Sequence, residues 1–160
     1  MDRWEHWIEE RIAGRRVAVV GVGNALRGDD GLGPAVVARL HGSRAHAINA
    51  GIVPENFLGV LIETRPDVVL FVDALDQGAP AGTCAAVVPA ALQSRGPDTH
   101  APSVRLMAKL LERHGIACWV LGIQPGTSVL GAGLTPAVAE AVERLAGALS
   151  AALEREASHA

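Results

Sequence analysis

One segment near the start of the chain, VAVVGVGNALRGDDGLGPAVVARL (residues 17–40), constrains the fold more than any other. It begins with a continuous apolar run, which is typical of a strand buried on both faces of a sheet. A glycine-rich turn follows, and Pro34 then stands where the first turn of a helix accepts proline. A strand, a glycine-rich turn and a helix in this order are typical of α/β proteins with a parallel sheet.

The same alternation continues along the chain. Apolar runs predict five strands, and helical spacing of apolar residues predicts five helices: strands at 16–23, 45–51, 66–75, 82–90 and 116–125, and helices at 2–13, 34–40, 54–65, before Gly115, and at 135–153. We therefore expect an α/β three-layer sandwich, with a twisted, mostly parallel five-stranded sheet, one antiparallel strand and helices on both faces. Because only the segment DQGAPA separates the third run from the fourth, we expect these two strands to form an antiparallel hairpin.

Composition limits the organisation and the partners of the chain. Its 160 residues predict a single domain over 1–160, with 1–15 as an N-terminal helical extension that serves as a packing helix or as a partner contact. The net charge is −3 and the basic residues are dispersed, so we expect no nucleic-acid partner. No apolar run approaches the length of a membrane span and no signal peptide is evident, so we expect a cytoplasmic monomer with no membrane contact.

The glycine-rich turn is a poor match to known phosphate loops. Its glycines lack the third position of the dinucleotide fingerprint. Gly23 and Gly28 have the spacing of a P-loop, but Asp29 and Asp30 occupy the positions of its lysine and serine or threonine. Two carboxylates would repel a phosphate and attract a cation. A nucleotide-binding α/β enzyme therefore stays only as an alternative.

A cation site can be predicted from the order of the elements. Ligands of open α/β sheets bind outside the carboxyl ends of the parallel strands, and Asp30, Asp73 and His100 are all predicted at that edge. Two carboxylates and an imidazole suit a divalent transition metal such as nickel or zinc. We expect Asp29 to cap the following helix or to orient its neighbour.

Further residues at the same edge are expected to shape a substrate cleft, because glycines let a peptide approach the backbone closely. They are Asn24, Asp29, Gly51, Asn56, Gln124, Gly126 and Thr127. The sequence contains no HExxH motif and no evident Ser-His-Asp or Cys-His arrangement, which disfavours zincin, serine and cysteine mechanisms.

Five motifs carry a resemblance to a known family. GVGNALRGDDGLGP, GIVPENF, FVDALD, DTH and GIQP occur in this order, and over residues 16–147 the chain resembles the hydrogenase maturation endopeptidases. The combination of DDGLGP with GIQP is most similar to the formate-hydrogenlyase, or hydrogenase 3, branch.

This resemblance implies a protease that removes the C-terminal extension of a NiFe hydrogenase large-subunit precursor after nickel insertion. It implies Asp30, Asp73 and His100 as the catalytic and nickel-binding residues, although many relatives have Glu at the position of Asp30. The implied nickel could be carried only by the substrate, and cadmium or zinc could replace it in vitro. The resemblance leaves open whether the metal polarises the peptide carbonyl, whether it activates water, or whether Asp30 acts as a general base. A non-catalytic precursor chaperone or a nickel carrier is the alternative within the same biology.

Overall fold

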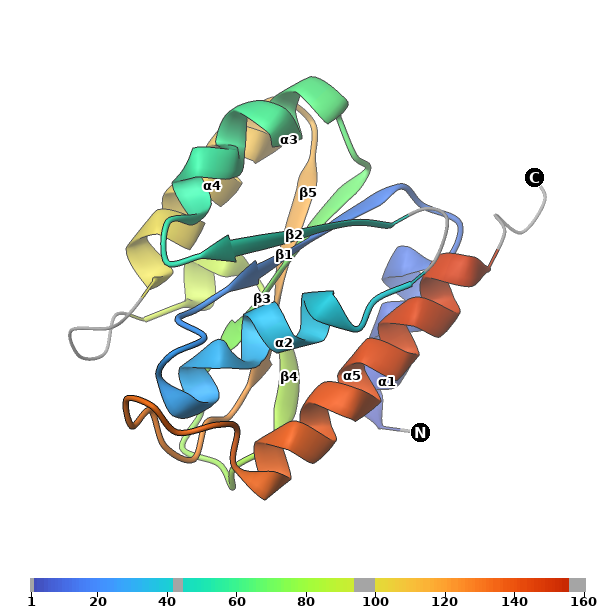
Figure 1. Cartoon of the computed structure of the whole chain (residues 1–160). Helices are drawn as coiled ribbons and strands as arrows, with labels where there is room; N and C mark the ends of the chain where they lie inside the picture. Colours follow the sequence, from blue (N-terminus) through green and yellow to red (C-terminus); the bar gives the residue numbers. More distant parts are fainter. Residues whose placement is uncertain (1, 42–44, 94–99, 156–160) are drawn as a thin grey trace.

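The structure is a computed structural model, which describes residues 2–41, 45–93 and 100–155 (Figure 1). Strands and helices alternate along most of the described chain, as the sequence predicts, and only the third and fourth strands follow each other directly. In order, with η marking short 3-10 turns, they are α1 (Arg3–Ile12), β1 (Val17–Val22), η1 (Gly28–Gly31), α2 (Leu32–Ala38), β2 (Ala45–Gly51), η2 (Pro54–Phe57), α3 (Leu58–Thr64), β3 (Val68–Ala74), β4 (Cys84–Val87), η3 (Pro89–Ala91), α4 (Ala101–Arg113), β5 (Ala117–Ile123) and α5 (Pro136–Glu154).

The strands form one five-stranded sheet in the order β2-β1-β3-β5-β4. Strands β2, β1, β3 and β5 run parallel, and β4 pairs antiparallel with β5. The predicted α/β architecture, with a mostly parallel sheet and one antiparallel strand, is confirmed.

The predicted hairpin between the third and fourth strands is wrong. Strand β4 pairs with β5, with Cys84 opposite Ile123, and does not pair with β3. The reason lies in the centre of the sheet, where β3 has a parallel neighbour on each side, β1 and β5. The chain therefore passes from β3 to the far side of β5, where an edge of the sheet is free.

Helices cover both faces of the sheet, and each face has its own core. Alternate residues of a strand point to opposite faces. Val17 and Val19 join the core formed with α1, α2 and α5, whereas Ala18 and Val20 join the core formed with α3 and α4. Figure 1 shows these two helical layers on either side of the strands.

The N-terminal helix α1 packs against the body of the protein. Trp4, Ile8 and Ile12 lie on one side of the helix and are buried. The ring of Trp7 meets that of Trp119 edge to face, with 5.4 Å between the ring centroids. Of the two roles expected for this segment, the structure shows the packing role.

The order of the strands creates a crevice at the carboxyl ends of β1 and β3. The chain leaves β1 toward β2 on one side and then returns to β3 on the other side. Connections that diverge in this way leave a ligand-binding crevice between them. The start of helix α2 packs closely against this point. A Cβ at Gly33 would lie 2.4 Å from the carbonyl oxygens of Val22 and Val72, so glycine is needed there.

In the part of the chain that the structure describes, no helix is both long enough and apolar enough to cross a membrane.

Candidate functional site

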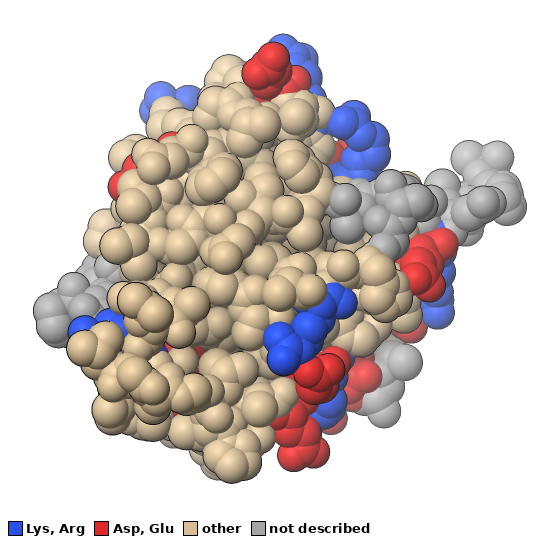
Figure 2. Space-filling view, in the orientation of Figure 1, with Lys and Arg blue, Asp and Glu red and all other residues tan. Residues whose placement is uncertain are grey.

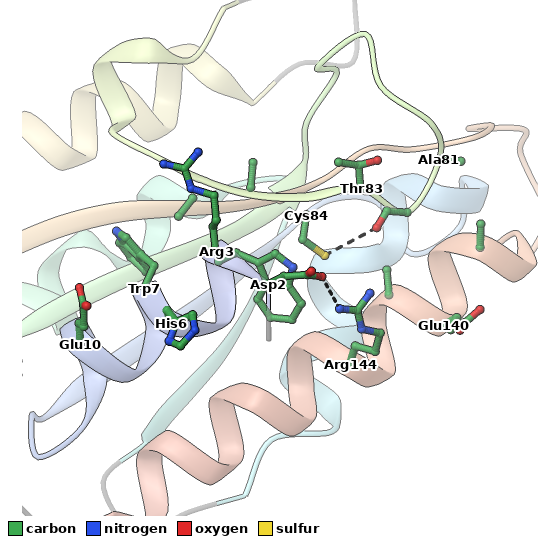
Figure 3. A pocket seen from close by; sticks show the side chains of 16 residues that line it. Asp2, Arg3, His6, Trp7, Glu10, Ala81, Thr83, Cys84, Glu140 and Arg144 are labelled. Atoms are coloured by element: carbon green, nitrogen blue, oxygen red, sulfur yellow. Dashed lines mark hydrogen bonds and ion pairs between the residues drawn. The ribbon is translucent and has the colours of Figure 1, made fainter.

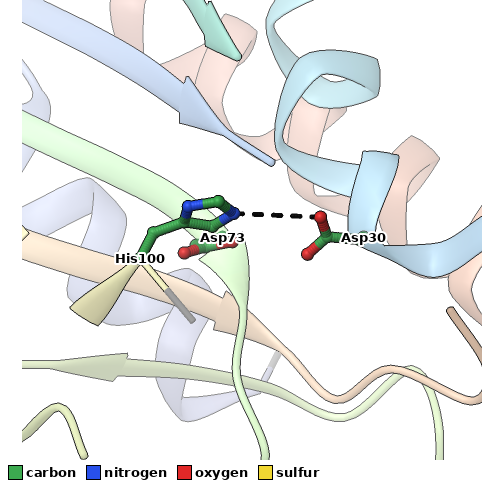
Figure 4. Close-up of side chains that lie close together, drawn as sticks. All are labelled: Asp30, Asp73 and His100. Carbon is green, nitrogen blue, oxygen red and sulfur yellow. Dashed lines mark ion pairs between the residues drawn. The ribbon is translucent and has the colours of Figure 1, made fainter. Parts of the chain in front are cut away.

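Three side chains predicted from the sequence meet at this crevice (Figure 4). Asp30 lies in η1, just after β1; Asp73 lies at the end of β3; and His100 is the residue that precedes α4. One potential ligand atom from each residue lies within 4.8 Å of those of the other two. The distance from His100 Nε2 to Asp30 Oδ2 is 3.8 Å. Three segments far apart in the sequence therefore supply one compact cluster.

The glycine-rich turn positions Asp30. Gly23 has a φ of 141°, and a Cβ there would lie 1.9 Å from the carbonyl oxygen of Asp30, so the turn closes this tightly only with glycine. The backbone N–H of Asn24 donates to Asp30 Oδ2 at 2.8 Å. The side chain of Asn24 in turn accepts a hydrogen bond from the N–H of Leu26 at 2.9 Å. These bonds fix the direction in which the Asp30 carboxylate points.

The two carboxyl groups of the cluster have different proton affinities. Burial alone would raise the pKa of Asp30, but the nearby imidazole of His100, the hydrogen bond from the Asn24 N–H and the charge of Arg27 lower it below its usual value. Burial raises the pKa of Asp73 to about 7, against the opposing effects of His100 and the Ala74 N–H. At neutral pH one carboxyl is ionised and the other exchanges a proton readily, a combination that suits acid–base chemistry.

The donor set of the cluster also fits a divalent transition metal. Carboxylate oxygens and imidazole nitrogens are ligands of nickel and zinc in proteins. Because the carboxylates of Asp30 and Asp73 lie close to the imidazole of His100, the three groups can coordinate one ion together. Three protein ligands leave coordination positions for groups from a substrate.

The cluster lies in a cleft of about 660 Å3. Besides the three residues, its walls come from residues 74–78 after β3, residues 91–93, Ala101 at the start of α4, Pro125 after β5, and Ser128. The FVDALD motif could indicate the first of these segments, because it continues past the end of a strand at the ligand-binding edge. Residues 91–93 follow β4, and the sequence alone does not indicate that they reach this edge.

Asp29 has a different role from Asp30. It is fully buried, and its carboxylate accepts hydrogen bonds from the N–H groups of Gly126, Thr127 and Thr135 and from the Thr135 hydroxyl, at 2.7 to 3.1 Å. Burial would raise the pKa of Asp29, but the bonds from Thr135, Thr127 and Gly126 lower it below its usual value. Thr135 is the N-cap of α5, so Asp29 caps that distant helix and not the helix that follows it.

We call this set of four bonds to the Asp29 carboxylate the Asp29 clamp. It joins the loop after β1 to the loop after β5. Gly126 and Thr127, which the sequence predicts in the cleft, belong to the clamp and hold its buried carboxylate through their backbone.

The other predicted cleft residues lie close to the crevice in different ways. Asn24 supports Asp30, and the carbonyl of Gly51 accepts a hydrogen bond from the Gly23 N–H at 2.8 Å. Asn56 is exposed in η2. The buried side chain of Gln124 accepts hydrogen bonds from the N–H groups of Gln77 and Ala79, and so holds the loop that forms one wall.

None of the seven predicted cleft residues is among the described residues that line the cleft. Gln124 and the Asp29 clamp instead hold neighbouring loops through hydrogen bonds. Direct contact of these residues with a substrate stays a prediction.

A second hollow, of about 1150 Å3, lies between α1, β4 and α5 (Figure 3). We call it the α1–β4 groove. Arg144 forms ion pairs at its surface: the guanidinium lies 2.7 Å from Asp2 and 3.1 Å from Glu5. Cys84 lies in the groove, and burial raises the pKa of its thiol to about 11, so it is protonated at neutral pH.

Both cysteines are free thiols. Cys84 is half-buried and Cys118 is buried. Burial raises the pKa of Cys118 to about 12. Neither thiol is poised to act as a nucleophile.

Comparison with known proteins gives a consistent result. Residues 35–152 match the family model described as hydrogenase maturation protease. Among solved structures, the chain is similar to the NiFe hydrogenase maturation protease HycI from Thermococcus kodakarensis KOD1, with 29% identity, a TM-score of 0.82, and coverage of 92% of this chain and 98% of that one.

It is also similar to a hydrogenase 3 maturation protease, with 27% identity, a TM-score of 0.72, and coverage of 89% of this chain and 97% of that one. A protein of Methanocaldococcus jannaschii that carries the name of a hydrogenase maturation protease is 27% identical over 123 residues, which span 69% of this chain and 73% of that protein.

Proposed function

We propose the function of this chain from one premise: it belongs to the hydrogenase maturation protease family. The chain is an endopeptidase that removes the C-terminal extension of a NiFe hydrogenase large-subunit precursor once nickel has been inserted. The observation that carries this proposal is the convergence of Asp30, Asp73 and His100 at the crevice between β1 and β3. Two carboxylates and an imidazole in one cleft can bind the nickel that the precursor carries.

In this proposal the nickel arrives with the substrate and selects it. The cluster offers ligands to a metal that is already held by the precursor, so the metal-loaded precursor gains binding free energy that the empty precursor does not. When bound, the metal supplies Lewis-acid chemistry near the scissile peptide bond. Because only the nickel-loaded precursor gains this binding free energy, cleavage would follow nickel insertion.

The residues of the cluster divide the remaining work. Asp30, whose pKa is lowered, stays ionised at neutral pH, so its carboxylate can act as a metal ligand or as a general base. Asp73, with a pKa of about 7, can take up or release a proton at its carboxylate during the reaction. His100 Nε2 lies 3.8 Å from Asp30 Oδ2, where its imidazole can serve as the third ligand.

The branch and the location belong to the proposal as well. The motifs DDGLGP and GIQP support a substrate of the hydrogenase 3 type. We also propose that the reaction takes place in the cytoplasm.

The test is a processing assay on a purified precursor, prepared with and without nickel, with the product mass measured by mass spectrometry. We expect a shortened product only from the nickel-loaded precursor, and none with the Asp73→Asn variant. Binding of the precursor without any cleavage would identify a chaperone, and transfer of nickel without cleavage would identify a nickel carrier. Tight binding of a nucleotide would favour the α/β nucleotide enzyme instead.

A further inference from the structure

Large apolar side chains are exposed next to the cleft. In the described part of the chain, five of the eight exposed large hydrophobic residues lie in loops at the carboxyl edge of the parallel strands: Leu26, Ile52, Val53, Val129 and Leu130. Leu26, Val129 and Leu130 are 70%, 60% and 66% exposed. Apolar residues gathered in this way on a surface typically mark a contact with another molecule.

Three of these residues form one continuous surface, which we call the apolar rim: Leu26, Val129 and Leu130. The loops that carry them are bonded to each other. The N–H of Gly131 donates to the carbonyl of Leu26 at 2.8 Å, and Arg27 and Leu130 form an isolated antiparallel bridge. The apolar rim is therefore built from two loops that lie about one hundred residues apart in the sequence.

The apolar rim borders the cleft directly. Ser128, which lines the cleft, precedes Val129, and Asp30 follows the loop that carries Leu26. A macromolecule whose metal reaches Asp30 therefore comes close to the apolar rim. Figure 2 shows few charged side chains over these loops, at the lower left of the face.

The apolar rim is held in place before any partner binds. The buried Asp29 clamp fixes the loop after β5 at Gly126, Thr127 and Thr135, on both sides of Val129 and Leu130. The N–H of Asp29 also donates to the carbonyl of Thr127 at 2.8 Å. A contact surface that is already ordered loses less conformational entropy when it binds.

We propose that the apolar rim is the docking surface for the folded body of the metal-carrying protein substrate, through an uncharged apolar patch on that substrate. This inference rests on the proposed function and adds a second recognition element to it. The cluster recognises the metal, and the apolar rim recognises the protein that carries it. Leu26 and Leu130 are the main anchors, because they are the largest and most exposed of the three.

The test compares Leu26→Ser, Leu130→Ser and the double variant with Leu106→Ser in steady-state processing of the nickel-loaded precursor. Leu106 is the matched control, since it is 58% exposed on α4, away from the apolar rim. Each rim substitution should raise KM about tenfold with kcat unchanged, because a leucine buried on binding loses its apolar contact. Leu106→Ser should leave both constants unchanged, and KM of the wild type should change little between low and high salt.

The outcomes separate this inference from the proposed function. If the wild type does not cleave the loaded precursor, the proposed function fails. If the wild type cleaves it and the double variant keeps the wild-type KM, the docking inference is overturned while the proposed function stands. Sedimentation of each variant completes the test: a wild-type dimer that the rim substitutions dissociate without a change in KM would assign the apolar rim to self-association and overturn the inference.

Discussion

The α1–β4 groove and the cleft at the carboxyl edge of the sheet differ in both size and chemistry. The groove is larger, at about 1150 Å3 against about 660 Å3. Its ion pairs, such as Arg144 with Asp2, are exposed at the surface. In the cleft, two carboxylates and an imidazole from three segments converge on one point. The candidate site is therefore identified by the three potential ligands that meet in the smaller cleft, and not by the volume of the hollow.

The largest expected effect is on processing activity, which a substitution in the cleft should lower and one in the groove should not. Asp73→Asn in the cleft should lower processing of the loaded precursor on the order of a thousandfold, because it removes both a potential ligand and a titrating group. Asp2→Asn in the groove should leave the rate unchanged. The measurement is kcat/KM for both variants, with thermal unfolding to confirm that each is folded. Equal losses of kcat/KM in both variants would show that the groove contributes to the reaction as much as the cleft does.

The second effect is on stability and concerns the clamp behind the cleft. Asp29→Ala should lower the free energy of unfolding at pH 7 by about 3 kcal/mol, because it leaves buried donors of Gly126, Thr127 and Thr135 without their acceptor. The pKa of Asp29 is lowered in the folded state, so its contribution is complete above the ordinary value of 3.8 and disappears as the pH falls through the lower folded pKa. Urea unfolding should therefore show a smaller difference between wild type and variant at pH 3 than at pH 7. A difference that is equal at both values would contradict this assignment.

The third effect is a pH dependence of metal binding at the cleft. Nickel titrated into the protein alone must displace the proton of Asp73, whose pKa is about 7. Below this value the carboxyl is protonated and competes with the metal, so affinity should rise about tenfold between about pH 6 and about pH 8. Calorimetry in two buffers measures the affinity and the number of protons released. An unchanged pH dependence in Asp73→Asn would show that another group is responsible.

The smallest effect is expected in the groove. Arg144→Gln removes the exposed pairs with Asp2 and Glu5, and such pairs contribute little in water. We expect a change in Tm of no more than about 2 °C and unchanged processing. A large fall in processing would show that the groove takes part in the reaction.

The fold and the cluster could be predicted from local patterns. Strands β1 and β3 are continuous apolar runs, and each was predicted to within about two residues of its observed ends. Ligands of open α/β sheets bind at the carboxyl ends of the parallel strands, and this rule predicted that Asp30, Asp73 and His100 lie at one edge. Their meeting is a finding of the structure, and their roles in catalysis and metal binding stay predictions.

The errors came from relations between distant segments. The partner of β4 depends on the order of the strands in the sheet, and neither the sequence of β4 nor the short loop before it contains that order. The role of Asp29 depends on Gly126, Thr127 and Thr135, which no local pattern connects to it. The two adjacent aspartates were predicted to have different roles, but the helix that Asp29 caps was predicted wrongly.

The long reach of the Asp29 clamp sets an order of events during synthesis. Asp29 is made 97 to 106 residues before the groups that bond to it. Until the chain has been extended through Thr135 and α5 has docked, the buried carboxylate lacks its donors, and the turn that presents Asp30 lacks its support. Contacts between such distant segments slow folding, because a long loop must close before they form. We therefore expect a chain that ends before Thr135 to leave the turn that presents Asp30 without this support.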